Sequence, residues 1–128
     1  MIYPENFESK IGFDRIRELL KERCLSPMGI EKVDGIHFNT DTALISEQLT
    51  ATYEFQQLLV FEENFPSDNY FSFSACLNKI RIEGTFPEVR EIYDLKRSLE
   101  TVRAILNFFR SKEETKYPIL KKLCGPVK

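Results

Sequence analysis

The residues best suited to bind a ligand lie at the end of the chain, from Arg110 to Lys128. Six basic side chains and two acidic ones occur in this stretch. Aromatic residues, Phe108, Phe109 and Tyr117, are interleaved with the basic ones. Basic side chains neutralise phosphates, and aromatic rings stack on bases. The pattern therefore predicts a nucleic-acid contact surface at Lys112, Lys116, Lys121 and Lys122.

The same tail has a second interpretation, a solvated lysine face. Phe108 and Phe109 also fit the apolar periodicity of a helix, and a helix buries such residues instead of offering them to bases. The formal net charge of the whole chain is −2, so there is no overall attraction to nucleic acid or to an anionic membrane. The tail alone carries the positive charge.

Other patterns that perform chemistry are absent from the sequence. It contains neither GxxxxGK[ST] nor GxGxxG, and its single histidine, His37, lies in a linker. The adjacent acids Glu62–Glu63 and Glu113–Glu114 diverge on a helix, so they are interpreted as solvated surface. Three widely spaced cysteines fit reduced core thiols. We expect no catalysis, no cofactor and no metal in this chain.

Apolar spacing and helix punctuation predict an all-α fold, a helical bundle or a segment of a larger helical domain, with about six helices. Ser26 and Pro27 are a typical N-cap and first helical position, and Thr40 is expected to cap the longest central helix. Pro87 is expected at the first position of the last long helix. The expected helices span 5–11, opened by Pro4, then 14–24, 27–34, 41–61, 74–84, 87–110 and 118–125.

The helix at 87–110 carries a heptad-like apolar seam. Its members recur at alternating intervals of three and four residues, which is typical of helices that pair side by side. Two partners are possible: an antiparallel helix of this chain, such as 41–61, or a helix of another molecule. The seam consists of Ile92, Leu95, Leu99, Val102, Leu106 and Phe109.

A second group of aromatic residues flanks the expected loop at 62–69. It either folds over the ends of the helices as core or forms an interface patch that meets another domain. Its members are Phe61, Phe65, Tyr70, Phe71 and Phe73.

Length and composition fit one helical domain or domain fragment over residues 1–128. Apolar residues make up 42% and charged residues 30%, which is ordinary for a globular protein. No apolar run approaches the roughly 20 residues that cross a bilayer, and the first ten residues do not resemble a signal peptide. We expect a cytoplasmic protein without membrane contact.

Several short segments, in order, resemble the N-terminal region of the bacterial MutS-two proteins, paralogues of the DNA mismatch-repair MutS family. The first is Phe13–Leu20, which resembles a helix of the form F-x-x-I/V-x-x-x-L. The others are Ser26–Gly29, Thr50–Phe55, Ile80–Thr85 and Tyr117–Leu120. The last of these resembles an F/Y-P-x-L element that follows a long helix in the family.

The resemblance implies a start of the helical core and lever domain in a longer protein. Such a protein binds ATP and Mg²⁺ and dimerises through domains that are absent here, and it acts on branched DNA in recombination control or on stalled ribosomes. The segment itself would relay nucleotide state between the ATPase and a distal clamp. Its partners would be the remainder of its own chain and, through it, DNA or the ribosome.

Two other functions remain open from the sequence. One is a stand-alone protein–protein interaction module that uses the 92–109 seam or the aromatic patch. The other is a small nucleic-acid binder that works through the basic tail.

Overall fold

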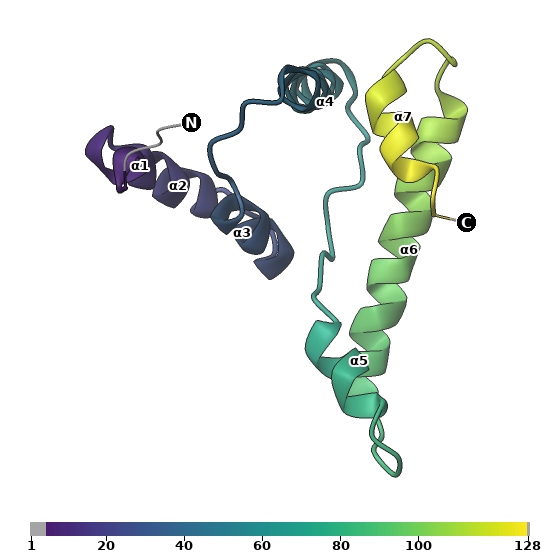
Figure 1. Cartoon of the computed structure of the whole chain (residues 1–128). Helices are drawn as coiled ribbons and strands as arrows, with labels where there is room; N and C mark the ends of the chain where they lie inside the picture. Colours follow the sequence, from purple (N-terminus) through teal and green to yellow (C-terminus); the bar gives the residue numbers. More distant parts are fainter. Residues whose placement is uncertain (1–4, 128) are drawn as a thin grey trace. The chain divides into compact units, whose positions relative to one another are not determined.

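All regular secondary structure is α-helical over the part of the chain that its computed structural model describes, residues 5–127. Pro4 and Lys128 lie outside this range. Seven helices and no strand occur in it, which confirms the all-α prediction. Figure 1 shows them in chain order. They are α1 (Phe7–Lys10), α2 (Phe13–Lys21), α3 (Pro27–Asp34), α4 (Thr42–Phe61), α5 (Ser74–Ile80), α6 (Val89–Ser111) and α7 (Pro118–Cys124).

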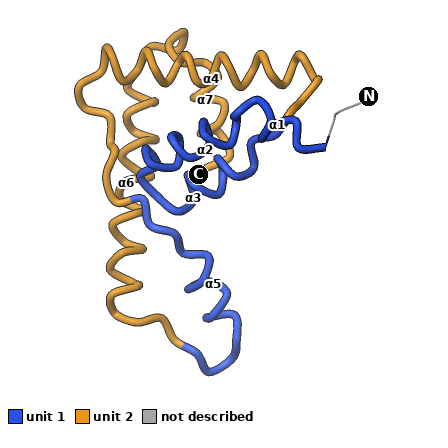
Figure 2. The backbone as a smooth tube through the Cα atoms, turned by 90° about the vertical axis from the view of Figure 1, so that its left-hand side faces the viewer, with its two compact units in different colours: residues 1–37, 70–85 blue, residues 38–69, 86–128 orange. Residues whose placement is uncertain are grey.

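The helices belong to two compact units, which are coloured separately in Figure 2. The first contains the chain up to His37 together with residues 70–85. The second contains residues 38–69 and 86–128, and therefore α4, α6 and α7.

In the first unit, α1 packs against α2, and α2 packs against α3. Gly12, at φ 77°, adopts the left-handed conformation between α1 and α2, which a residue with a side chain rarely accepts. Arg17 of α2 ties the three helices together. Its guanidinium forms ion pairs with Glu8 and Asp14 and donates to the carbonyl of Ile36.

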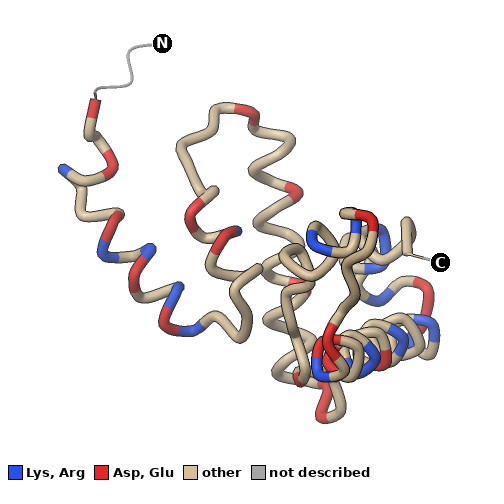
Figure 3. The backbone as a smooth tube through the Cα atoms, turned by 90° about the horizontal axis from the view of Figure 1, so that it is seen from below, with Lys and Arg blue, Asp and Glu red and all other residues tan. Residues whose placement is uncertain are grey.

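The start of α3 matches the prediction. The Ser26 hydroxyl accepts a hydrogen bond from the Gly29 amide at 3.2 Å, and Pro27 occupies the first turn, where its missing N–H costs nothing. Acidic and basic positions follow one another along this N-terminal part of the chain (Figure 3).

The caps of α4 and α6 differ from the predictions. Asp41, not Thr40, caps α4, because its carboxylate accepts from the Ala43 and Leu44 amides at 3.0 and 3.1 Å. At the start of α5, Phe73 stands at the N-cap position.

At α6 the helix begins two residues after Pro87. The amide of Glu88 donates to the Glu91 carboxylate at 2.7 Å, so a reciprocal acidic cap replaces proline as the start signal. The helix expected over 74–84 ends earlier, at Ile80, and a turn follows it. Thr85 closes this turn by donating its hydroxyl to the carbonyls of Lys79 and Ile82.

No helix among the described residues is both long enough and apolar enough to cross a bilayer.

Candidate functional site: a carboxylate clamp in the second unit

The second unit is organised around two glutamates of α4 and the loop after it. Glu54 is only 8% exposed, although it is a charged residue. Glu62 follows the last residue of α4, and its side chain is 13% exposed. Buried carboxylates require hydrogen-bond or charged partners, because desolvation penalises the ion. Both glutamates find these partners in the C-terminal segment, residues 112–122.

Glu54 caps the start of α7. Its two carboxylate oxygens accept hydrogen bonds from the amides of Ile119 and Leu120, at 3.2 and 3.0 Å. These amides lie in the first turn of the helix, where no intrahelical acceptor exists. Tyr117, at the N-cap position, provides no side-chain cap, and Pro118 has no N–H to donate. Glu54 therefore takes the role of the missing cap and places negative charge at the positive end of the helix.

Glu62 binds the residues that lead into α7. The ammonium of Lys112 forms an ion pair with one of its oxygens, and the Tyr117 hydroxyl donates to the other at 3.3 Å. The hydrogen bond from Lys112 is the main reason that the pKa of Glu62 is lowered. Burial, together with the negative charge of Glu62, raises the pKa of Tyr117. We call Glu54, Glu62, Lys112, Tyr117 and the first turn of α7 the carboxylate clamp.

Tyr117 carries backbone strain at the centre of this arrangement. Its φ of 55° is in the left-handed region, which costs a residue with a side chain about 1–2 kcal/mol. Its hydroxyl bond to Glu62 and the Glu54 cap on the next two amides hold this conformation in place. The strained residue therefore marks the point where the chain reverses from α6 into α7.

Lys121 contacts the backbone at the end of α6, on the other side of this chain reversal. Its ammonium donates to the backbone carbonyls of Lys112, at 3.0 Å, and Glu113. Carbonyls at the C-terminal end of a helix lack intrahelical partners and attract cations. An acid of α4 thus caps the start of α7, while a base of α7 caps the end of α6.

Aromatic rings form the apolar floor beside these polar contacts. Phe65 packs edge-to-face against Phe55, Phe108 and Phe109, with centroid distances of 5.5, 5.3 and 6.2 Å. Phe109 also meets Tyr117 at 6.5 Å. Such pairs add about 0.5–1.5 kcal/mol each beyond their buried area. Leu58, the one fully buried large side chain of the described residues, lies on α4 one turn after Glu54.

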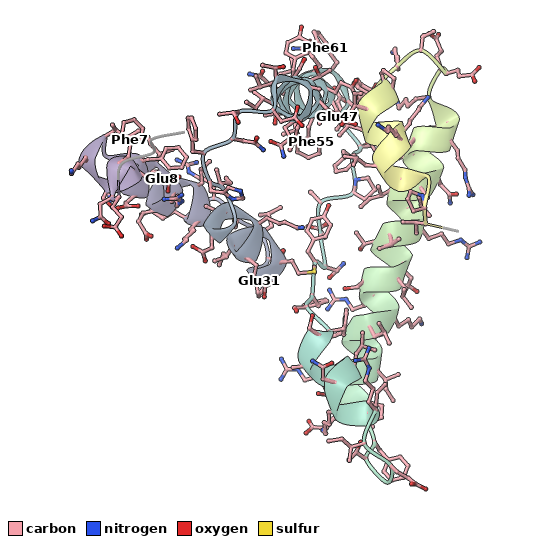
Figure 4. The ribbon with its side chains drawn as sticks, viewed as in Figure 1. Phe7, Glu8, Glu31, Glu47, Phe55 and Phe61 are labelled. Carbon is pink, nitrogen blue, oxygen red and sulfur yellow. The ribbon has the colours of Figure 1, made fainter. Side chains whose placement is uncertain are left out.

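The predicted aromatic patch is therefore not one surface. Phe65 is half-buried in the core of the second unit, as the first interpretation expected. Phe61 is 70% exposed. It projects from the side of α4 opposite to Phe55 (Figure 4). Tyr70, Phe71 and Phe73 belong to the other unit.

Three of the four lysines predicted to contact nucleic acid have partners within the chain. Lys112 pairs with Glu62 and lies 4.7 Å from the centre of the Phe108 ring. Lys121 caps α6, and Lys122 pairs with Glu47 at 2.7 Å on the exposed surface. Lys116 is exposed in the turn between α6 and α7. These contacts give the tail a structural role that the sequence pattern did not indicate.

A cleft of about 390 Å³ lies between the end of α6 and α7. Leu106, Phe109 and Cys124 contribute apolar surface, and Arg110 and Lys121 contribute charge. Burial raises the pKa of the Cys124 thiol, so at neutral pH it is a protonated, weakly reactive group. All three cysteines are half-buried, which places them at the edge of the core.

The predicted seam of α6 is divided. Phe109 is 6% exposed and Leu106 is half-buried, whereas Ile92 and Leu99 are more than half exposed. The 41–61 helix, one of the two partners considered for this seam, corresponds to α4, which packs against α7. Leu95 is half-buried, and Val102 is 39% exposed.

Sequence reasoning missed both glutamates of the clamp. Glu62 was interpreted as solvated surface because it is adjacent to Glu63, yet its partners come from a different helix. A signal for Glu54 was present in the segment Tyr117–Pro118, since a helix that starts there lacks a side-chain cap and needs an acceptor from elsewhere.

The contacts of the clamp position helices. No group of three or more His, Cys, Asp or Glu side chains among residues 5–127 could hold a metal ion. Its donors and acceptors are already paired with one another, so the arrangement fixes the path of the chain.

Comparison with known proteins gives one consistent result. An endonuclease MutS2 of Fusobacterium nucleatum is 25% identical over 117 residues, which cover 91% of this chain. Those of Alkaliphilus metalliredigens and Alkaliphilus oremlandii are 29% and 26% identical over 86% and 88% of it. The matches support a MutS2-related region. No protein-family profile matches the chain, and no solved structure does.

The chain spans only 13–15% of the length of these MutS2 relatives. Within the MutS2-related region, two of the short segments that carry the resemblance meet in the clamp. Glu54 lies in the segment Thr50–Phe55, and the amides that it caps lie in the segment Tyr117–Leu120.

Proposed function

We propose that this chain is a non-catalytic helical core and lever segment of a MutS2-like ATPase. In this proposal it forms the N-terminal part of a longer cytoplasmic protein that binds ATP and Mg²⁺ and dimerises through other domains. The segment relays nucleotide state from the ATPase towards a clamp on branched DNA in recombination control, or on a stalled ribosome. The similarity to MutS2 proteins over most of the chain supports this proposal.

The observation that carries the mechanical role is the pairing of Glu54 with the first turn of α7. A lever transmits motion only if its helices are joined rigidly, and buried hydrogen-bonded carboxylates fix a junction better than apolar contacts alone. The junction joins three helices, α4, the 23-residue α6 and α7. Glu54 binds the start of α7, and Lys121 binds the carbonyls at the end of α6. Movement of one helix is then expected to carry the others.

The experiment that tests this proposal begins with the coding sequence beyond the codon for Lys128. The proposal requires an open frame that encodes GxxxxGK[ST]. In the full-length product, Glu54→Ala should leave basal ATP hydrolysis intact and reduce its stimulation by branched DNA or ribosomes. Glu47→Ala, on the exposed face of the same helix, is the matched control. A stop codon after Lys128 would contradict the proposal, as would unchanged stimulation in the Glu54 variant.

The alternative is a stand-alone helical interaction module. This alternative assigns the apolar seam of α6, which includes Ile92 and Leu99, to the binding of another protein. A module of this kind should unfold cooperatively as an isolated chain without binding a hydrophobic dye, whereas a fragment with uncovered faces should bind the dye or self-associate. Sedimentation and dye fluorescence of residues 1–128 distinguish the two.

Nucleic-acid binding by the basic tail is the weakest proposal, because most of its lysines pair within the chain. It predicts that affinity falls steeply with salt. Lys116→Glu combined with Lys122→Glu changes the two exposed lysines without removing Lys112 or Lys121 from the clamp. Unchanged nucleic-acid binding by this double variant would contradict the proposal.

A further inference from the structure

The N-terminal half of α6 presents an apolar face beside a shallow groove of about 380 Å³. Ile92 is 52% exposed and Leu99 is 58% exposed. Every residue that lines the groove belongs to α6, so the groove runs along one helix. The lining residues are Ile92, Leu95, Lys96, Leu99, Glu100 and Arg103.

The spacing of the apolar residues defines the shape of the occupant. From Ile92 to Val102 they recur at intervals of three, four and three residues, which matches the side of a second helix crossing at a small angle. At a rise of about 1.5 Å per residue, this face is about 15 Å long. It accommodates about three turns of a partner helix.

The charges beside the face define the chemistry of that helix. Lys96 and Arg103 lie on the same flank of the seam, seven residues apart. Lys96 is already paired with Glu100 at 3.8 Å. Arg103 is exposed and lies about two turns closer to the clamp than Lys96. An occupant with an acidic residue opposite Arg103 complements this flank.

A second copy of the chain fits this face poorly. An antiparallel pair of α6 helices would bring Lys96 and Arg103 against the same cations of the other copy, which is repulsive. In a parallel pair, the flank with Lys96 and Arg103 would face the opposite flank of the other helix, which contains Ser98. The loop after α4 occupies that flank, where the Ser98 hydroxyl donates to the Asn69 carbonyl at 2.7 Å.

We propose that this face binds an amphipathic helix, acidic along one flank, from the polypeptide that follows residue 128 in the longer protein. This inference rests on the proposed function. It is supported by the length of the MutS2 relatives, of which this chain spans at most 15%. The clamp fixes one end of α6, and the docked helix covers the other end.

The test uses the full-length gene product with p-benzoylphenylalanine in place of Leu99. Irradiation followed by peptide mass spectrometry identifies which segment lies against this face. The expected product is an intramolecular cross-link to a later helix with Asp or Glu on one flank. Arg103→Glu should reduce its yield by about two- to fivefold, because it replaces an attractive charge by a repulsive one. Arg90→Glu, on the outward side of the same helix, should leave the yield unchanged.

The outcomes separate the inference from the proposed function. Cross-links to a second copy, to residues 1–85 of the same chain, or to none would overturn the inference even if the frame encodes an ATPase. Equal cross-link yields from the Arg103 and Arg90 variants would contradict the claim that the docked helix has an acidic flank opposite Arg103. A reading frame that ends at Lys128 would overturn the proposed function, and the inference with it.

Discussion

The two halves of α6 carry the same apolar spacing but have opposite environments. At the C-terminal end, Phe109 is buried beneath Phe65, and the helix terminus is capped by Lys121. At the N-terminal end, Ile92 and Leu99 are exposed. A heptad pattern therefore indicates which side of a helix is suited to packing, and other parts of the chain decide whether that side is covered.

The largest expected difference concerns the apolar residues of these two halves. Phe109→Ala should lower the free energy of unfolding by about 3–5 kcal/mol, because it leaves a cavity among the aromatic rings. Leu99→Ala should change it by less than about 0.5 kcal/mol, since this side chain is exposed. Urea unfolding of residues 1–128, followed by circular dichroism, measures both. Equal losses would show that the two halves are equally buried.

The next largest effect is expected at the clamp. Glu54→Ala should destabilise the chain by about 1–3 kcal/mol, because two amides of α7 lose their acceptor in a buried position. Glu47→Ala removes only the exposed pair with Lys122 and should cost less than about 1 kcal/mol. The same unfolding measurement applies. A Glu54 effect no larger than that of Glu47 would argue against a buried cap.

The pH dependence of stability provides a third comparison, between Glu62 and its exposed neighbour Glu63. The pKa of Glu62 is lower in the folded chain than its ordinary value of 4.5. Its contribution to stability is therefore present above that value and is lost as the pH falls through the folded pKa. Below about pH 5 the Glu62→Gln variant should lose stability less steeply than the wild type. The stability of Glu63→Gln should depend on pH as that of the wild type does. If the stability of Glu62→Gln also falls as steeply as that of the wild type, the account is contradicted.

The smallest expected effect separates the two adjacent lysines of α7. Lys121→Met removes the cation from the end of α6 and should cost about 0.3–1 kcal/mol. Lys122→Met removes an exposed ion pair and should cost no more than about 0.5 kcal/mol. The comparison requires thermal unfolding of both variants at low and high salt. If Lys122→Met is the more damaging substitution, Lys121 does not cap α6.

The sequence was sufficient where a structural feature depends on neighbouring residues. Ser26 caps α3 through an amide three residues away, and Gly12 separates α1 from α2 through its own backbone freedom. Both follow from local chemistry. The start of α4 was misplaced by one residue, because Thr40 and Asp41 are both capable caps and only the backbone geometry selects Asp41.

Local sequence patterns could not predict the clamp, because its partners are far apart in the sequence. Glu54 and the amides that it caps are 65 and 66 residues apart in sequence. Glu62 and Lys112 are 50 residues apart. Which acid meets which helix end depends on how α4 and α7 pack. The resemblance to MutS-two proteins drew attention to the segments around Glu54 and Pro118 without indicating that they touch.

Hydrogen exchange at two amides tests the central claim, that the Glu54 carboxylate caps α7, most directly. Amides in the first turn of a helix normally exchange fast, because they have no acceptor within the helix. The account predicts that Ile119 and Leu120 are protected in the wild-type chain and lose this protection in Glu54→Ala, while the amides of α3 are unaffected. Fast exchange of Ile119 and Leu120 in the wild type, or equal protection in the variant, would contradict it.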